Sequence, residues 1–291
     1  MRTIAFFSHV PACGKTTACV NVAAALAEMG RQVLVVDLDA QACATSLLGR
    51  PVGLDNSVLA ALLAERPLRA VIQRTPVKRL WLAPACAELS RIEQMGAVPD
   101  PNRATPDGLL TEVALALELQ EFQEPFDYIL LDCPSQPIFM HRLVLVACDE
   151  VVVPAGLSLK ALYATTPTLQ LILSAQKVRG DGLPVFLGYL LHRSGRGSIP
   201  REMQRTLARY QLPCFSTIRH SVLVRSLPYR RDVLERLMIF AYPNHPVAAA
   251  YRRVAREIDL GIEAARRLAA ELARAPSGLT PPSRPTARQN R

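Results

Sequence analysis

Gly14-Lys15-Thr16-Thr17 is the stretch that decides the fold, because it lies between a mostly apolar run and an alanine-rich segment. The run Thr3–Ser8 (TIAFFS) predicts a buried strand, and Lys15–Met29 (KTTACVNVAAALAEM) has the apolar spacing of a helix. Gly30 follows directly and suits the left-handed residue that ends many helices. The sequence therefore predicts a strand, a tight turn and a helix in immediate succession.

Further apolar runs predict the other strands of a sheet. Val33–Asp37 (VLVVD) is rich in β-branched residues, which is typical of a strand buried on both faces. Strands that alternate with helical segments indicate a parallel sheet covered on both sides. We therefore expect an α/β fold of three layers, α/β/α, with a mostly parallel, twisted central sheet. The remaining strands are expected at Leu80–Ala83, Tyr128–Leu131, Val151–Val153, Val185–Leu191 and Cys214–Thr217.

The sequence changes character near its C-terminal end. A last helix is predicted for Pro246–Ala273, and residues 275–291 are rich in proline, polar and basic residues. Such a composition buries too little apolar surface to fold. We expect one domain over residues 1–274 and a disordered, basic tail over residues 275–291.

The turn at residues 14–17 carries the residue types that hold a phosphate group. Phosphate binding uses backbone N–H groups at a helix N-terminus, a lysine and, where magnesium takes part, a hydroxyl. Gly14, Lys15, Thr16 and Thr17 supply these parts in order. A GKT sequence is common by chance, so this interpretation needs support from elsewhere in the chain.

Three aspartates supply that support, because each follows a predicted strand. Asp37 and Asp39 end the run VLVVDLD, and Asp132 ends the run YILLD. The carboxyl ends of parallel strands border the crevice in which such folds bind ligands. Any one of these residues could instead be a helix cap or a turn residue. Three of them at strand ends favour a binding site.

The positive charge of the chain is concentrated in one segment. The net charge is +9, and residues 193–256 alone hold thirteen arginines against three acidic residues. A basic surface confined to one segment is typical of a protein that binds a polyanion such as DNA. A solvated arginine-rich face without a partner remains the alternative.

The remaining composition excludes several other classes of protein. No apolar run approaches the roughly 20 residues of a membrane-spanning helix, and Met1-Arg2 leads into a strand without a signal-peptide pattern. The seven cysteines are scattered without CxxC pairs, which argues against a zinc site or a disulfide framework. We expect a cytoplasmic protein.

Three motifs at matching spacing resemble the ParA/Soj/MinD family of ATPases. That family reads KGGxGKTT, DxDPQ and DCPP, and this chain has VPACGKTT at 10–17, DLDAQ at 37–41 and DCPS at 132–135. The likeness continues at 80–85, 147–162 and 216–228. It implies a P-loop NTPase fold, ATP and Mg²⁺ as ligands, and a homodimer in the ATP state.

The resemblance also implies a role for each residue of the motifs. Lys15 neutralises the β- and γ-phosphates, and Asp39 orients the attacking water; these two are the catalytic residues. The Mg²⁺ ligands and their support are Thr16, Asp37 and Asp132. The nucleotide-binding residues are those of the loop, Pro11, Ala12, Cys13, Gly14, Lys15, Thr16 and Thr17.

The loop also departs from the family pattern. The signature lysine, which reaches the phosphates of the partner subunit, is replaced by Val10. Losing such a cation lowers the rate of phosphoryl transfer by about 10³ or more, by analogy with arginine fingers. Pro11 lacks a backbone N–H, and Ala12 carries a Cβ where the family has glycine. His9 is an alternative source of positive charge, although a neutral imidazole is favoured.

Three functions remain open at this point. The first is a ParA-like ATPase that dimerises with ATP, binds DNA without sequence preference, is released by a ParB-like or cargo-adaptor activator, and positions a plasmid, a chromosome or other cargo on the nucleoid. The second is a nucleotide-binding scaffold or regulator with impaired hydrolysis. The third is a MinD-like membrane-cycling regulator, which is disfavoured because Leu279 is the one bulky apolar residue after Leu272 in the sequence. The candidate DNA-binding residues are Arg193, Arg196, Arg219, Arg225, Arg230, Arg231, Arg252 and Arg253.

Overall fold

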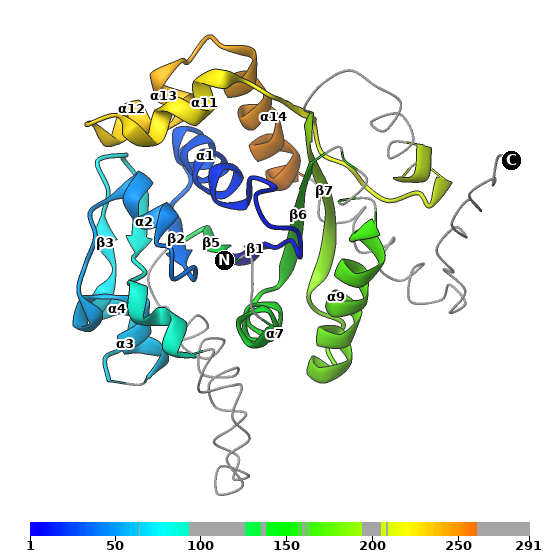
Figure 1. Cartoon of the computed structure of the whole chain (residues 1–291), viewed down its shortest axis with the longest axis horizontal. Helices are drawn as coiled ribbons and strands as arrows, with labels where there is room; N and C mark the ends of the chain where they lie inside the picture. The colour runs from blue at the N-terminus through cyan, green and yellow to red at the C-terminus, as the bar shows by residue number, and fades with distance from the viewer. Residues whose placement is uncertain are drawn as a thin grey trace, which may run out of the picture.

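The protein is a single twisted sheet with helices on both faces (Figure 1). The structure, a computed structural model, describes residues 1–63, 65–92, 126–134, 138–156, 158, 161, 163–193, 205–207 and 209–260. The strand order is β3-β4-β2-β5-β1-β6-β7-β8, and every neighbouring pair is parallel except β3 with β4. This arrangement confirms the expected α/β fold. The strands are β1 (Arg2–Phe6), β2 (Val33–Asp37), β3 (Gln73–Arg74), β4 (Leu80–Ala83), β5 (Tyr128–Asp132), β6 (Glu150–Gly156), β7 (Val185–Arg193) and β8 (Ile218–Arg219).

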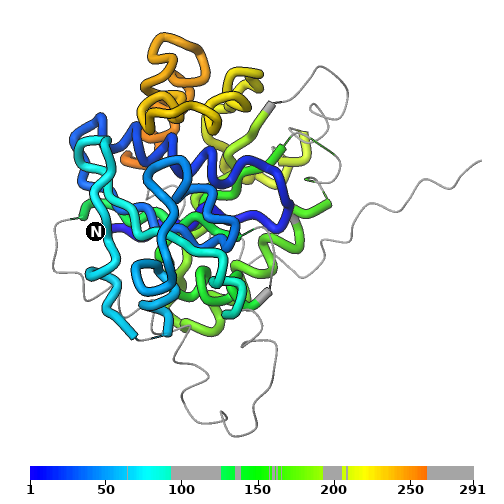
Figure 2. The backbone as a smooth tube through the Cα atoms, turned by 60° about the vertical axis from the view of Figure 1, so that its left-hand side comes forward, coloured from blue at the N-terminus to red at the C-terminus, as the bar shows by residue number. Residues whose placement is uncertain are grey.

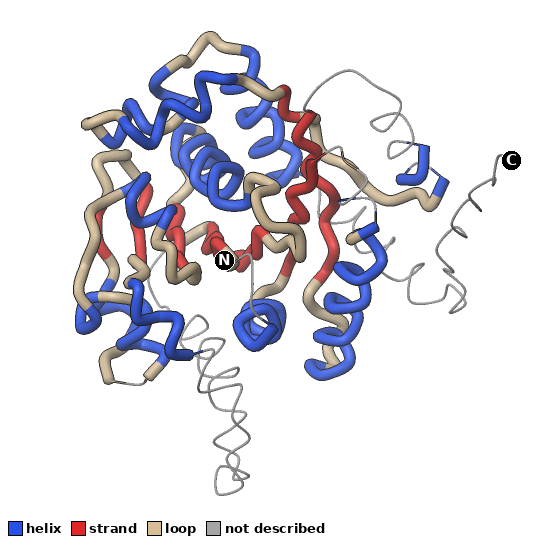
Figure 3. Tube along the Cα trace, in the orientation of Figure 1, coloured by secondary structure: helices blue, strands red, loops and turns tan. Residues whose placement is uncertain are grey.

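The helices form the two outer layers (Figure 3). Helices α1 and α14 pack against each other on one face, and α7 packs against α9 on the other. Figure 2 shows the C-terminal elements α13 and α14 next to α1. The described helices are α1 (Lys15–Glu28), α2 (Cys43–Leu48), α3 (Val58–Leu62), α4 (Leu68–Val71), α7 (Ile138–Ala147), α9 (Thr165–Arg179), α11 (Val222–Ser226), α12 (Val233–Arg236), α13 (Met238–Ala241) and α14 (Pro246–Leu260).

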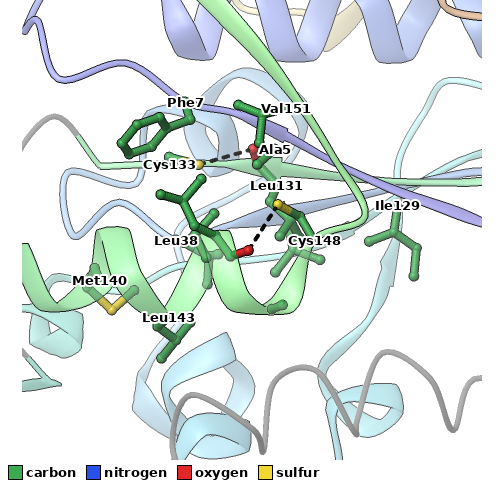
Figure 4. Packing of buried hydrophobic residues seen from close by; sticks show 14 of the residues in the cluster. Ala5, Phe7, Leu38, Ile129, Leu131, Cys133, Met140, Leu143, Cys148 and Val151 are labelled. Carbon is green, nitrogen blue, oxygen red and sulfur yellow. Dashed lines mark hydrogen bonds between the residues drawn. The ribbon is translucent and has the colours of Figure 1, made fainter. Parts of the chain in front are cut away.

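Both faces of the central strands are apolar, which explains their unbroken hydrophobic runs. In β1, Ile4 and Phe6 belong to the core beneath α1 and α14, whereas Ala5 belongs to the core beneath α7. Figure 4 shows this second core, in which the thiols of Cys133 and Cys148 donate to backbone carbonyls of Leu131 and Leu145. Burial raises the pKa of both thiols. These cysteines act as small apolar packing residues.

Helix α1 ends as its sequence predicts. Gly30 follows the helix with a φ of +94°, and its N–H donates to the carbonyl of Ala27 (3.0 Å). A residue with a side chain is strained in this conformation, so glycine ends the helix at low cost. The next residues then enter β2, beside β5 in the middle of the sheet.

The strand expected at Cys214–Thr217 is wrong in position. Within the described residues Cys214 makes one isolated bridge with Tyr189, and regular pairing with β7 begins at Ile218. The N–H of Ser216 donates to the carboxylate of Glu257 in α14 (2.8 Å) instead of to β7. A side chain of the covering helix therefore interrupts the ladder. The antiparallel edge strand β3 was not expected either.

Some expectations fall outside the described residues. These are the tail at 275–291, the part of the last helix after Leu260, and Arg196. Helix α14 begins at Pro246, as expected. Among the described helices, none combines the length and apolarity that crossing a bilayer requires.

Candidate nucleotide-binding site

The loop between β1 and α1 leaves the N-terminus of α1 open. Gly14 is the first flanking residue of this 14-residue helix, and among the described residues no side chain caps it. The first turn also holds no acidic residue. The first N–H groups of a helix have no partner within it, and the helix dipole makes this end attractive to an anion. The loop therefore has the backbone arrangement of a phosphate site.

Gly14 is required here for two reasons. Its φ is +88°, in the left-handed region that favours glycine. A Cβ at this position would also lie 2.4 Å from Cε1 of His192, at the end of β7. Burial lowers the pKa of His192 to about 4, so the imidazole is neutral at pH 7. A neutral ring thus packs against the loop backbone, a contact that the sequence did not reveal.

Lys15 lies inside the loop that precedes it. Its side chain is buried, and its ammonium nitrogen is 3.4 Å from the carbonyl oxygen of Val10 and 4.0 Å from Sγ of Cys13. The positive charge is therefore held next to the open end of α1, where it adds to the helix dipole. The role of Lys15 in binding phosphates stays a prediction.

Two of the expected carboxylates lie side by side in the sheet. Asp37 of β2 and Asp132 of β5 are direct partners in the parallel register, and both are fully buried. Asp37 accepts hydrogen bonds from the N–H (2.7 Å) and hydroxyl (2.8 Å) of Thr45 and from the N–H of Asp39 (3.2 Å). Neither carboxylate oxygen of Asp132 has a hydrogen-bond partner within the described part of the chain.

This pair is electrostatically costly without a cation. Burial raises the pKa of Asp37 to about 6, although the hydrogen bonds from Thr45 oppose the rise. Burial and repulsion from Asp37 raise the pKa of Asp132 well above its usual range, while the nearby Thr16 hydroxyl and Lys15 act in the opposite direction. A buried ionised carboxylate needs a partner charge or hydrogen bonds.

The residues present fit a magnesium ion. Mg²⁺ in nucleotide sites is held through one or two carboxylates together with phosphate oxygens and water. The unpartnered oxygens of Asp132 supply a carboxylate that is otherwise unsatisfied. Thr16, in the first turn of α1, supplies the hydroxyl near it. Asp37 is already engaged by Thr45, which agrees with a supporting role.

Asp39 lies in the turn that links the end of β2 to α2. Its carboxylate accepts from the N–H of Gln41 (2.9 Å), and its carbonyl accepts from the N–H of Ala42 (2.8 Å). The side chain is only partly buried, unlike those of Asp37 and Asp132. Asp39 is thus the carboxylate of the three that water can reach; its role in orienting a water molecule stays a prediction.

Thr45 is a site residue that sequence reasoning missed. Besides holding Asp37, its hydroxyl accepts from the N–H of Ala85 after β4 (2.9 Å). Nothing in the sequence marks it, because it lies mid-helix among apolar residues. It joins α2 to the ends of two strands and so fixes α2 to the carboxylate site.

The unusual residues of the loop differ in their exposure. Val10, in the position of the family's signature lysine, has a side chain that is 9% exposed, whereas His9, Pro11 and Ala12 are exposed. Ala12 has a φ of +55°, the left-handed conformation for which glycine is better suited. The chain thus keeps the glycine-like backbone at Ala12 at a cost in strain.

The expected DNA-contacting arginines have different surroundings. Arg252 is bound within the molecule: it pairs with Glu28 (2.6 Å) and donates to the carbonyls of Pro243 (2.6 Å) and Ile239 (3.3 Å). The side chain of Arg193 lies outside the described atoms. The exposed members are Arg219, Arg225, Arg230, Arg231 and Arg253.

Comparisons with known proteins agree with this geometry. A sequence profile described as an AAA domain matches residues 1–182. The chromosome-partitioning ATPase Soj of Thermus thermophilus is 30% identical over 271 residues, which cover 91% of this chain and 98% of the relative. The chain belongs to the ParA/MinD family of P-loop ATPases.

One further relative and one solved structure are also similar to this chain. The sporulation initiation inhibitor protein Soj of Bacillus subtilis is 32% identical over 177 residues, which cover 60% of this chain and 66% of that protein. A structure described as cobyrinic acid a,c-diamide synthase from Mycobacterium smegmatis, with bound ADP and magnesium, has a TM-score of 0.71 at 27% identity. That match covers 89% of this chain and 94% of the other.

Replacing Asp132 by asparagine should stabilise the ligand-free protein. The change removes a buried acid beside Asp37, and we expect the free energy of unfolding at pH 7 to rise by roughly 1 to 3 kcal/mol. Because folding raises the pKa of Asp37, protonation favours the folded state, and wild-type stability should fall as pH rises through about 6. Denaturant unfolding at pH 5 and pH 8 measures both effects.

Asp55→Asn serves as the control for this substitution, since Asp55 is exposed. It should change stability little at either pH. Any extra stability that Mg²⁺ with nucleotide gives the wild type should be smaller in Asp132→Asn. Destabilisation of the ligand-free protein by Asp132→Asn would contradict the interpretation of the carboxylate pair.

Replacing Ala12 by glycine should also stabilise the protein. The left-handed backbone of Ala12 costs about 1 kcal/mol for a residue with a Cβ. We expect the free energy of unfolding to rise by about that amount. Ala70→Gly, at an exposed position in α4, should instead lower it by about 0.5 to 1 kcal/mol. Equal destabilisation by both substitutions would show that Ala12 is unstrained.

Proposed function

We propose that the protein is a ParA-type switch that binds ATP with Mg²⁺, dimerises in that state and hydrolyses the nucleotide slowly. The observation that carries this proposal is the open N-terminus of α1, with Lys15 beside it, facing the buried carboxylates of Asp37 and Asp132. The arrangement offers positive charge for phosphates and negative charge for a metal ion at the carboxyl ends of the central strands.

The residues of the site divide the work of such a reaction. The N–H groups at residues 14–17 and the charge of Lys15 bind and orient the phosphates, and Thr16 and Asp132 hold the metal. A bound Mg²⁺ ion supplies neutralisation of the phosphate charge. Asp39, which water can reach, positions the attacking water. Phosphoryl transfer relies on positioning and charge stabilisation, and these contacts are of both types.

DNA is the partner that the exposed arginines favour. Arg219, Arg225, Arg230 and Arg231 fall within thirteen residues of sequence and are all exposed. Contacts of this kind go to phosphates and carry no base-reading pattern, so binding should be independent of sequence. Relatives named as chromosome-partitioning ATPases support the same direction. We infer a cytoplasmic, nucleoid-associated protein that positions a plasmid, chromosome or other cargo with a ParB-like or adaptor activator.

A second function, a nucleotide-binding scaffold without effective hydrolysis, is favoured by one observation. Val10 replaces the cation that relatives contribute to the partner subunit, and its side chain is buried. The transition state then lacks one stabilising charge. The two functions differ in rate and share the same binding site.

Phosphate release distinguishes these functions. With excess ATP, Mg²⁺ and plasmid DNA, we expect wild-type protein to release phosphate slowly but faster than Asp39→Ala, because the variant cannot position water. Asp55→Ala, which removes an exposed acid elsewhere, should match the wild type. Identical rates for wild type and Asp39→Ala would exclude the ATPase and leave the scaffold.

DNA binding tests the arginine surface. Arg219→Ala with Arg225→Ala should weaken binding to duplexes of unrelated sequence to a similar extent. The slope of log K against log salt should become shallower by up to about two, since each lost phosphate contact changes it by about 0.9. The control removes the same charge with Arg69→Ala in α4 and Arg74→Ala in β3, the edge strand opposite β8; both arginines are exposed. If the double variant Arg219→Ala, Arg225→Ala binds DNA with unchanged affinity, the DNA surface lies elsewhere.

A further inference from the structure

Arg236 connects two parts of the chain that lie far apart in sequence. Its Nη1 donates to the carbonyl of Ser46 in α2 (2.6 Å), 190 residues away. Its Nε and Nη2 donate to the carbonyls of Arg230 and Arg231 (both 2.9 Å). All three nitrogens of one guanidinium group are therefore used, and they join α2 to the turn that presents Arg230 and Arg231.

Helix α2 is in turn fixed to the carboxylate site. Thr45 precedes Ser46 and holds Asp37 through its N–H and its hydroxyl. The turn that carries Asp39 leads directly into this helix, with the N–H of Ser46 donating to the carbonyl of Ala42 (2.9 Å). A rearrangement of Asp37 or Asp39 around a ligand would therefore move the N-terminal end of α2, a helix of only six residues.

The other end of the connection is exposed. Arg230 and Arg231 follow a short 3₁₀ helix (Leu227–Tyr229) and precede α12, whose N-terminus Asp232 caps by accepting from the N–H of Leu234 (2.8 Å). Their side chains are exposed, while their carbonyls point to Arg236. Figure 1 shows α12 lying next to α2. The backbone of this turn is therefore positioned by the same group that contacts α2.

We propose that Arg236 is a positioning residue that transmits the nucleotide state of the carboxylate site to the polyanion-binding turn at Arg230 and Arg231. This inference rests on the proposed function and deepens it, because it names the internal route by which nucleotide binding changes DNA affinity. A shift of α2 moves the carbonyl of Ser46, and the guanidinium carries the two carbonyls on its other side with it. Arg236 itself contacts neither nucleotide nor DNA in this scheme.

The geometry requires arginine at this position. A guanidinium group is planar and presents donors in fixed directions, so it can hold three carbonyls from two elements at once. A lysine ammonium carries the same charge but is a compact point charge on a flexible stem. Arg236→Lys therefore separates geometry from charge, and Arg236→Ala removes both.

The measurement is the affinity for a fluorescent DNA duplex, without nucleotide and with a slowly hydrolysed ATP analogue and Mg²⁺. Coupling between two sites is typically 5- to 150-fold. We expect a ratio of at least about fivefold in the wild type and a ratio near one in Arg236→Ala. Arg236→Lys should also have a ratio near one, while keeping the wild-type salt dependence of binding. Affinity for the nucleotide analogue alone should be unchanged in both variants.

A second readout uses the ligand-free protein. Hydrogen exchange of peptides covering residues 227–238 should become faster in both variants, since the turn loses its anchor. Arg256→Ala removes an exposed arginine from α14 and should change neither the ratio nor the exchange.

The outcomes separate the inference from the function on which it rests. A wild-type ratio of one, or no nucleotide binding, overturns both. A wild-type ratio above fivefold that persists in Arg236→Ala and Arg236→Lys overturns the role of Arg236 alone. A ratio that persists only in Arg236→Lys also overturns it, because charge and not geometry would then be responsible.

Discussion

The structure depends on two carboxylates that lie opposite each other in adjacent parallel strands, out of reach of solvent. Asp37 and Asp132 repel each other in a medium that screens them poorly, and Asp132 has no hydrogen-bond donor within the described residues. Folding tolerates this pair because the apolar residues before them in β2 and β5 are buried on both faces. Because this pair destabilises the ligand-free protein, binding of a cation there would stabilise the folded state.

The positive half of the site lies at the same end of the central strands. No side chain in the described part of the chain caps the start of α1, and the ammonium group of Lys15 is turned into the loop in front of it. The carboxylates supply negative charge, and the helix terminus with Lys15 supplies positive charge. A ligand with both a metal ion and phosphate groups would match both halves of the site, which is why the proposed ligand is a nucleotide with Mg²⁺.

Sequence alone predicted what depends on local pattern. Runs such as Val33–Asp37 predicted buried parallel strands, and register then brought Asp37 next to Asp132 because both end their strands. What could not be predicted depends on contacts between distant residues. Glu257 of α14 takes the N–H of Ser216 and shifts the last strand, and arginines that look equivalent in sequence have different roles: Arg252 is held by Glu28, and Arg236 by carbonyls of α2 and its own turn.

The loop itself limits how a partner subunit could complete the site. A cation that reaches another subunit must start from an exposed side chain, and the side chain of Val10 is buried while its carbonyl faces Lys15. Of loop residues 8–14, the exposed ones are His9, Pro11 and Ala12, and among these only His9 can carry a charge. Its ring lies 6.1 Å from that of His141, whose Nε2 donates to the carbonyl of Pro134, two residues after Asp132 (3.2 Å). Any positive charge that this loop offers to another subunit therefore has to come from His9, whose ring lies beside that of His141.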